Sequence, residues 1–446
     1  MGPSFFFAGN AVFLYLCRLR VKTQTLYIMK RTFIFIAASL LALGSLSACD
    51  KQNPDIQEDP EENVGDKPFE PIVLTKAEME ISQSANQFGF DVYHKIYKDK
   101  DIFMSPLSIS LALSMTASGA AGQTAEQMLS VLGFEGQSTA DLGSYYQKMV
   151  AALLEADPKT TFEVANSIWA NNDEIHVLDS FKDNVVKYYS SEIHSADFSL
   201  QSTVDRVNKW VSDKTHEKIP SILDGPDPDL VMALINALYF KGKWAFDFDE
   251  GTKKENFRKL SGGKAKVDMM TVKKQFQYSE QDGFKMVSLP YGNGSFTMDV
   301  ILPPEDEDFE KAVARFDAKL YTKLIHGSYG TTIVNLKLPK FTFSYDVDLT
   351  RTLIGLGMDQ AFTVSADFSA MAKEPLCISK VLHKTFVDVN EKGTEAAAVT
   401  FVGMMATSMP NPPAPQNVDF FADRPFMFVI KESSTGAVLF IGQKVG

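Results

Sequence analysis

The sequence predicts an α+β protein in which early helices pack on a large mixed or antiparallel sheet. Three helix-start signals occur within residues 75–133, and the first is followed by apolar residues at helical spacing. Strand patterns replace them from residue 230 onward. The chain has 446 residues, 45% of them hydrophobic and 22% charged, so enough apolar material is present for a sizeable core.

Three helices are predicted at the start of the folded part. Residues 75–78 have the spelling of a capping box, which satisfies backbone N–H groups at a helix start. Ser105 and Pro106 supply an N-cap and a proline at the first helical position of a second helix. Residues 124–127 are expected to cap a third helix that stops at Gly133.

Three strand patterns follow. Residues 230–240 form a nearly continuous apolar run with Asn236 as its polar interruption, which is typical of a strand buried on both faces. Residues 296–302 alternate as a sheet strand does and end at two prolines. The last pattern, residues 426–441, predicts a closing β-hairpin around a polar turn.

The N-terminus indicates a targeting segment. Basic residues after Met29, apolar residues 33–46 and small residues before Cys49 resemble the lipobox of a bacterial lipoprotein. About 14 apolar residues are too few to span a bilayer of ~30 Å. We therefore expect residues 29–48 to be a lipoprotein signal peptide, Cys49 to be lipidated and residues 1–28 to be an over-extended start.

The segment after Cys49 predicts a spacer. Residues 49–73 are acidic and carry few apolar side chains, as expected of a solvated tether. Residues 74–446 should then form one large domain. We expect a cell-envelope lipoprotein at the outer membrane or cell surface, facing the extracellular space or the periplasm, that touches the membrane through its lipid alone.

Composition and motifs exclude several functions. A net charge of −12 without a Lys/Arg-rich run argues against nucleic acid and heparin as partners. Ser261 and Lys264 fit an S-x-x-K spelling, but no K-T-G follows, and no other catalytic motif is present. The six histidines lack metal-ligand spacing and the three cysteines cannot form a disulfide framework. We therefore expect a monomer that is not an enzyme, with no catalytic residue, metal or cofactor.

The most informative segment is residues 391–400, which has a charged, glycine-containing start followed by small and β-compatible side chains. It is typical of neither a helix nor a loop. Such a segment could lie exposed in one state and become a central β-strand in another. This favours a protein that works by changing shape once.

Several segments together resemble the serpin family over residues 74–446. They occur in the family's order: FMSPLSIS at 103–110, VAN at 164–166, NALYFKGKW at 236–244, LPKF at 338–341, ADFS at 366–369, HK at 383–384, VNEKGTE at 389–395 and ADRPF at 422–426. The resemblance implies the serpin fold, a single domain of three sheets and eight or nine helices with an exposed reactive loop at residues 391–415.

The resemblance also implies an irreversible, suicide-type inhibitor of serine endopeptidases. A target protease would form an acyl-enzyme with the loop, and the cut loop would insert into the main sheet before the ester is hydrolysed. The alternative is a non-inhibitory serpin-fold binding or substrate protein, which is cleaved without trapping the protease.

The hinge of this loop has the composition that insertion requires. Alternate residues of a strand share one face, and Thr394, Ala396 and Ala398 are small and uncharged. A charge forced under the sheet would cost several kcal/mol. The hinge residues that the resemblance implies are Glu391, Gly393, Thr394, Glu395, Ala396, Ala397 and Ala398.

The family's spacing locates the reactive bond. Counting seventeen residues from Glu391 places the cut between Thr407 and Ser408. Alternatives for the residue before the cut are Ala406, Met405 and Met404. Because these side chains are uncharged, elastase-like, subtilisin-like or chymotrypsin-like targets are favoured over trypsin-like ones, with papain-like cysteine proteases as an alternative.

Two further groups carry over from the resemblance. One is a polar cluster that governs opening of the main sheet: Ser105, Ser108, Asn236 and His383. The other lies where the loop first enters the sheet and contains Trp244 and the pair Lys340–Glu391. An exposed ion pair contributes only ~0–1 kcal/mol, so packing of Trp244 should matter more.

Overall fold

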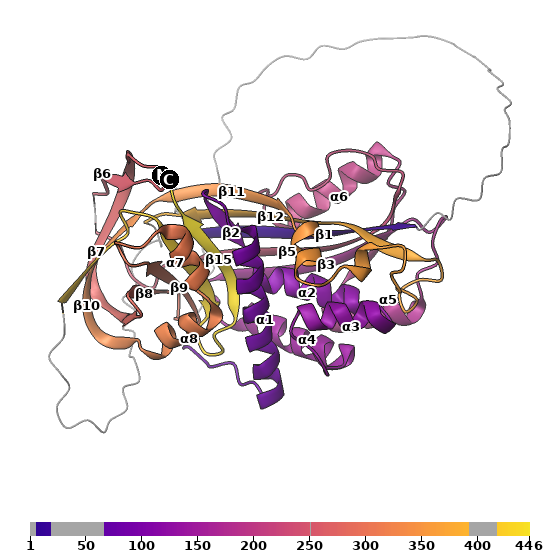
Figure 1. Ribbon diagram of the computed structural model, residues 1–446, viewed down its shortest axis with the longest axis horizontal. Coiled ribbons are helices and arrows are strands. Elements are labelled where there is room, and N and C mark those ends of the chain that lie inside the picture. The colour runs from indigo at the N-terminus through magenta and orange to yellow at the C-terminus, as the bar shows by residue number, and fades with distance from the viewer. Residues whose placement is uncertain (1–5, 19–66, 250, 392–416) are drawn as a thin grey trace, which may run out of the picture. The chain divides into compact units, whose positions relative to one another are not determined.

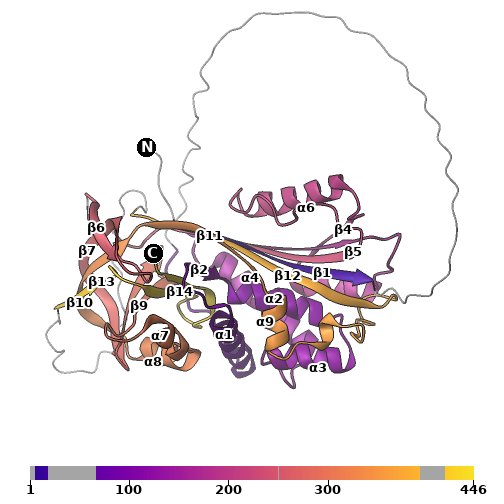
Figure 2. The same cartoon turned by 45° about the horizontal axis from the view of Figure 1, so that its top comes forward.

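A six-stranded sheet with helices on both faces dominates the computed structural model, which describes residues 6–18, 67–249, 251–391 and 417–446 (Figure 1). The strands, in spatial order, are β11 (Phe341–Asp348), β12 (Leu376–Val389), β1 (Phe6–Arg18), β5 (Leu230–Gly242), β3 (Thr161–Ala170) and β4 (Glu192–Ser195). Neighbours are antiparallel except β3 and β4. Helix α6 (Gln201–Lys214) covers one face, while α2 (Pro106–Ala117) and α4 (Thr139–Glu155) lie on the other (Figures 1 and 2).

Strand β5 shows why the sheet is apolar on both faces. Successive side chains of a strand point to opposite faces. Met232, Leu234 and Leu238 belong to the main hydrophobic core, whereas Ala233 and Ile235 belong to a second cluster with side chains of α6. The nearly continuous apolar run predicted to be doubly buried is therefore confirmed.

The remaining strands form a nine-stranded arrangement that is built around one long strand. Its members are β2 (Ile102–Met104), β6 (Lys253–Arg258), β7 (Lys264–Gln281), β8 (Phe284–Tyr291), β9 (Phe296–Leu302), β10 (Tyr329–Pro339), β13 (Asn417–Phe421), β14 (Phe426–Glu432) and β15 (Val438–Lys444). Strand β7 pairs with β6 and β10 along most of its length and with β8 at its end. It thus joins two sheets, which with the six-stranded sheet make the three sheets of the expected α+β fold.

Nine α-helices occur among the described residues, within the expected eight or nine. Those not yet introduced are α1 (Lys76–Ile96), α3 (Gly122–Val131), α5 (Asp179–Tyr189), α7 (Phe309–Arg315), α8 (Ala318–His326) and α9 (Thr350–Gly355). The capping box of α1 is present: Thr75 Oγ1 accepts from the Glu78 backbone N–H at 3.3 Å, and Glu78 Oε2 accepts from the Thr75 N–H at 2.7 Å. Ser105 caps α2, with Pro106 as its first residue.

The predicted start of the third helix is wrong by three residues, because the N-cap was expected at Thr124 and lies at Ala121. Helix α3 begins at Gly122, and its N-cap residue Ala121 makes no side-chain cap bond. Thr124, expected to cap the helix, is buried, and its hydroxyl accepts a hydrogen bond from the backbone N–H of Asp367 at 2.9 Å. A distant segment of the chain therefore takes the hydroxyl that the local pattern assigned to a cap.

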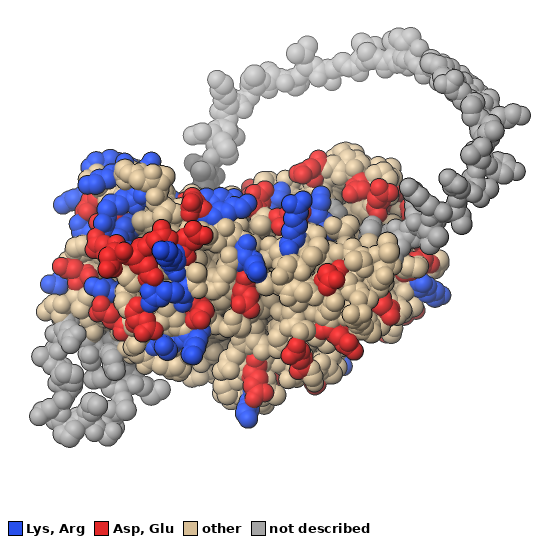
Figure 3. Space-filling model, viewed as in Figure 1, with Lys and Arg blue, Asp and Glu red and all other residues tan. Residues whose placement is uncertain are grey.

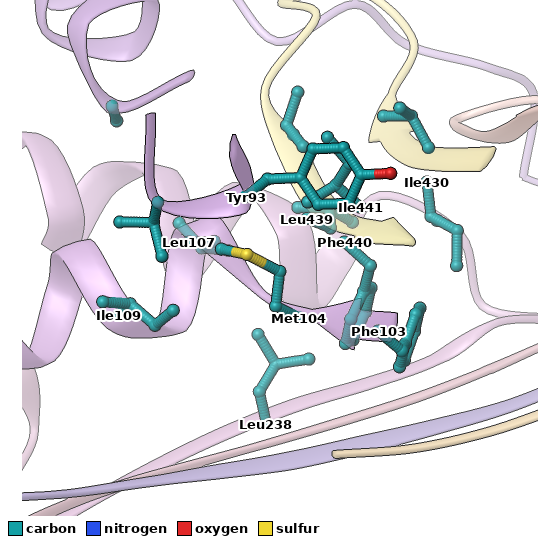
Figure 4. Close-up of a cluster of buried hydrophobic side chains, with 14 of the residues drawn as sticks. Tyr93, Phe103, Met104, Leu107, Ile109, Leu238, Ile430, Leu439, Phe440 and Ile441 are labelled. Carbon is teal, nitrogen blue, oxygen red and sulfur yellow. The ribbon is translucent and has the colours of Figure 1, made fainter. Parts of the chain in front are cut away.

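Aromatic and aliphatic side chains connect the helices to both sheets. Phe103 of β2 stacks on Phe440 of β15 with ring centroids 4.9 Å apart. Leu238 of β5 and Ile109 of α2 lie in the same cluster (Figure 4). The predicted C-terminal hairpin, now β14 and β15, is confirmed and forms one wall of this core.

Strand β1 comes from the segment interpreted above as an over-extended start. It belongs to the same compact unit as the rest of the described chain and is central in the six-stranded sheet (Figure 1). The start-site interpretation itself stays a prediction. No helix in the described ranges is long and apolar enough to cross a membrane.

Candidate functional site

The centre of the six-stranded sheet holds a slot between β5 and β12, and β1 fills it. Phe7 lies opposite Asp388 on one side and Lys241 on the other, and the pairing continues antiparallel on both sides to Leu16 and beyond. Val12, Leu14 and Leu16 are fully buried in the main core. Strand β1 therefore packs in the main core together with the helices beneath the sheet.

The direction of β1 matches what the predicted loop would need. Strand β12 ends at Val389, and the predicted loop follows it directly. A segment that turned back after Val389 would run antiparallel to β12, because adjacent segments joined by a turn reverse direction. Strand β1 begins near that end of β12 and runs the same way. The slot thus has the orientation that an inserted loop requires.

Four residues predicted to govern sheet opening are brought together beneath this slot. The Ser105 backbone N–H donates to His383 Nε2 at 3.1 Å, so this nitrogen carries no proton. Ser105 Oγ accepts from the Ser108 N–H at 3.2 Å, and Ser108 Oγ donates to Asn236 Oδ1. All four residues are fully buried. They form one connected network that links β5, β12 and the start of α2.

The network spans the slot. Val12 of β1 lies opposite Asn236 on β5 and opposite His383 on β12. Besides β1, the Ser105 cap of α2 links the two sides of the slot at this level. Strand β1 therefore separates Asn236 from His383 across the sheet.

Asn166 extends this network and was not among the predicted site residues. Its Oδ1 accepts from Asn236 Nδ2 at 2.8 Å, and its own Nδ2 donates to the backbone oxygen of Tyr189 at 2.7 Å. Asn166 and Asn236 are direct partners across β3 and β5. A buried asparagine in each of two strand segments was the available signal, but their register could not be known from the sequence.

The predicted loop-entrance residues also lie together. Trp244 Nε1 donates to the backbone oxygen of Asn390 at 2.9 Å, and its ring stacks on Tyr291 with centroids 4.4 Å apart. Lys340 Nζ lies 2.7 Å from Glu391 Oε2, and Thr252 Oγ1 donates to Glu391 Oε1. The chain is therefore fixed at Asn390 and Glu391, where the described residues stop.

The Glu391 carboxyl is stabilised in its charged form. Partial burial of this carboxyl would raise its pKa, but the hydrogen bonds from Lys340 and Thr252 outweigh burial, so the pKa of Glu391 is lowered below its ordinary value. Glu391 is consequently ionised, and its ion pair with Lys340 is intact, at neutral pH.

The rest of the predicted loop lies outside the described residues. This applies to hinge residues 393–398, to the candidate reactive-bond residues 404–408 and to the predicted lipidation site Cys49. The chain is described again at β13, which pairs in parallel with β10. The predicted loop thus starts at the end of a central strand of one sheet and ends on an edge strand of another.

Basic side chains gather over β6 and β7 (Figure 3). Several of them are paired with acids: Lys254 with Asp268 at 2.8 Å and Arg258 with Glu305 at 2.8 Å.

In the described part of the chain, no group of three or more His, Cys, Asp or Glu side chains could hold a metal ion.

Comparison with known proteins gives one consistent result. The family described as "Serpin (serine protease inhibitor)" matches residues 83–445. An uncharacterized serpin-like protein of Methanosarcina mazei is 33% identical over 374 residues, covering 82% of this chain and 87% of that protein. Leukocyte elastase inhibitor of Xenopus laevis is 34% identical over 379 residues, covering 81% and 98%.

Solved structures show the same similarity. The native state of the thermophilic serpin tengpin has a TM-score of 0.73 and 30% identity, covering 86% of this chain and 98% of that one. Thyroxine-binding globulin in complex with thyroxine has a TM-score of 0.71 and 26% identity, covering 82% and 99%.

Proposed function

The chain belongs to the serpin family, and on that premise we propose that it is an irreversible inhibitor of serine endopeptidases. The observation that carries this proposal is the slot between β5 and β12. It accepts a full-length antiparallel strand and opens beside the end of β12, from which the predicted reactive loop departs. A cut loop could therefore enter the sheet in continuation of β12.

The energetics favour insertion if the slot is otherwise unfilled. Each new backbone hydrogen bond contributes about 0.5–1.5 kcal/mol net. Complete burial of an apolar side chain, such as that of Leu14, contributes roughly 1.5–3 kcal/mol more. Ordering each loop residue costs ~1–2 kcal/mol. Two flanking strands and a packed core are thus needed together, and the slot provides both.

The proposed targets are proteases that cleave after small or unbranched uncharged residues. This rests on Thr407 as the preferred residue before the cut, with 404–406 as alternatives. The similarity to a leukocyte elastase inhibitor agrees with an elastase-like target. Trypsin-like proteases, which select a basic residue before the cut, should cleave this loop poorly.

The proposal is tested by mixing neutrophil or pancreatic elastase with protein that begins at Cys49, the form that leader cleavage would leave. An inhibitor gives a covalent 1:1 band that survives denaturing electrophoresis. Clean cleavage in the loop without that band would instead support the non-trapping alternative, in which the chain is a binding or substrate protein. Thyroxine-binding globulin, named for its ligand, makes a binding role the natural second candidate.

A single substitution in the hinge separates cleavage from trapping. Thr394→Arg places a charge on the face of the inserted strand that is expected to point under the sheet, where burial of a charge costs several kcal/mol. We expect loop cleavage at the normal rate and loss of the covalent band. Glu395→Arg, on the opposite face of the same segment, is the matched control and should retain most trapping. Stoichiometric trapping by the Thr394→Arg variant would contradict the proposed face.

We also propose that the mature protein is held in the cell envelope by a lipid on Cys49. The support is the order of basic, apolar and small residues directly before this cysteine. Labelled fatty acid should be incorporated into the wild type and recovered with membranes, whereas Cys49→Ser should incorporate none. Equal labelling of both proteins would contradict the assignment.

A further inference from the structure

The occupant of the slot is the chain's own N-terminus. Strand β1 uses the inward edge of β5 and the inward edge of β12 over its whole length. A sheet edge that is already paired offers no free backbone donors or acceptors to another strand. While β1 is in place, a cut reactive loop therefore has no edge on which to insert.

We propose that residues Phe6–Arg18 are a built-in plug, which keeps a chain that still carries its leader from trapping a protease. This inference rests on the proposed inhibitory function, and it requires translation from Met1 in place of the over-extended start predicted for residues 1–28. The plug fills the loop's slot in the loop's direction and enters beside the same end of β12. It also places Val12 between Asn236 and His383, so these two network residues lie on strands that are not direct neighbours.

The side chains of the plug support a specific fit. Leu14 lies opposite Leu234 on β5 and Val381 on β12, and Leu16 lies opposite Met232 and Ile378. Val12, Leu14 and Leu16 are fully buried in the core cluster that contains these partners. The buried face of β1 is thus apolar at three consecutive inward positions. Leu14 and Leu16 lie opposite apolar residues on β5 and β12, and Val12 lies opposite two residues of the polar network.

The location of the plug relates it to the predicted export signal. Residues 6–18 precede the apolar stretch 33–46 and Cys49. Cleavage before Cys49 would remove the plug and the signal peptide together. The plug can therefore act only on chains that still carry residues 6–18, and processing at Cys49 leaves the slot free.

The test compares full-length wild type with full-length Leu14→Glu. A carboxylate at this fully buried position should expel β1, while the domain keeps its own core. Leu14→Met, which keeps an apolar side chain of similar volume, is the matched control. Circular dichroism at room temperature checks that all three proteins are folded.

The first readout does not depend on inhibition. A fluorescent peptide with the sequence of residues 6–18 should bind the Leu14→Glu variant and shift its band on a native gel. It should not bind the wild type or the Leu14→Met variant. The variant should also melt several degrees below the other two proteins. Equal peptide uptake by all three proteins would overturn the plug, whatever their effect on proteases.

The second readout is trapping of elastase. We expect full-length wild type to be cleaved without a covalent band, and Leu14→Glu to form the band to at least tenfold higher yield. A wild type that traps as well as Leu14→Glu would overturn the plug. If neither these proteins nor the form beginning at Cys49 traps any protease, the proposed function fails, while peptide uptake still decides whether β1 occupies the slot.

Discussion

At the scale of single residues, buried polar groups define the site. Ser108, Asn166 and Asn236 are each within a few per cent of complete burial and satisfy one another. A buried polar group is tolerated only when its hydrogen bonds are made, so each member makes the others necessary. This mutual dependence gives the network a measurable energetic signature.

Asn236→Ala should therefore be strongly destabilising. The change leaves Ser108 Oγ without its acceptor and Asn166 Oδ1 without its donor, at a cost of about 1–3 kcal/mol for each group. We expect a loss of roughly 2–6 kcal/mol in the free energy of unfolding, measured by urea denaturation. Ser108→Ala should cost less, and the double variant should cost less than the sum. Strict additivity would show that the two residues are not coupled.

A buried ion pair in β9 and β14 makes a second residue-scale prediction. Lys431 Nζ contacts Asp299 Oδ2, which also accepts a hydrogen bond from the Tyr321 hydroxyl at 2.7 Å. Removing Lys431 leaves the buried Asp299 carboxylate without an opposite charge, which costs about 3–5 kcal/mol. Lys431→Met should lose this amount in urea denaturation. The double variant with Asp299→Leu should recover most of it, and no recovery would contradict the pairing.

Residue-scale features were only partly predictable. Asn236 could be recognised because a single polar residue interrupts an apolar strand. Asp299 is the one charged residue within 296–302, yet its partner Lys431 lies 132 residues away, and their contact depends on the pairing of β9 with β14. The register between two strands determines such contacts, and local sequence patterns do not predict the register between strands that are distant in the sequence.

At the scale of elements, the end of β12 is held by a small set of contacts. Trp244 fixes Asn390, and Lys340 with Thr252 fixes Glu391. These contacts come from the segments after β5, before β6 and between β10 and β11. The root of the predicted loop is thus clamped by three different parts of the chain, and each clamp can be released separately.

The Glu391 clamp should be sensitive to acid. Because its folded-state pKa is lowered, the ionised carboxyl contributes stability that is present above the unfolded-state value of 4.5 and is lost as pH falls through the folded value. Wild type should exceed Glu391→Gln in stability by at most about 1 kcal/mol at pH 7. The difference should vanish well below pH 4.5. Urea midpoints of both proteins at both pH values measure this difference in stability. The Lys340→Met variant should lose the same pH-dependent contribution of the Glu391 carboxylate.

Element types followed from the sequence better than element partners did. The capping box at Thr75 and the Ser105-Pro106 start fixed two helices correctly, because those signals involve only neighbouring residues. The cap assigned to Thr124 was wrong because Asp367 takes its hydroxyl. Strand β1 was not predicted at all, since a signal-like N-terminus carries no indication that it would pair with β5 and β12.

At the scale of the whole molecule, the slot determines how stability is distributed. A form that begins at Cys49 lacks β1, so β5 and β12 must meet directly or leave their inward edges without that partner. Either arrangement is less stable than the filled sheet, because a buried central strand adds hydrogen bonds and apolar contacts on both sides. Such a molecule gains stability when another strand arrives.

Heating should reveal this gain. We expect protein that begins at Cys49 to melt at a higher temperature after its reactive loop has been cut than before, since the freed segment can fill the slot. Calorimetry of intact and nicked samples measures the difference. Full-length protein, already filled by β1, should gain little from the same cut. A nicked form that melts no higher than the intact form would remove the energy source of the proposed trap.

The parallel pairing of β13 with β10 has one more consequence. A break anywhere between residues 392 and 416 divides the backbone in two, yet the shorter piece still contains β13, β14 and β15, which are interleaved with β10, β9 and β2. Both products should therefore elute from a sizing column as one particle of unchanged mass. The small fragment should separate only when the whole core unfolds, so cleavage alone does not change the mass measured for the folded protein.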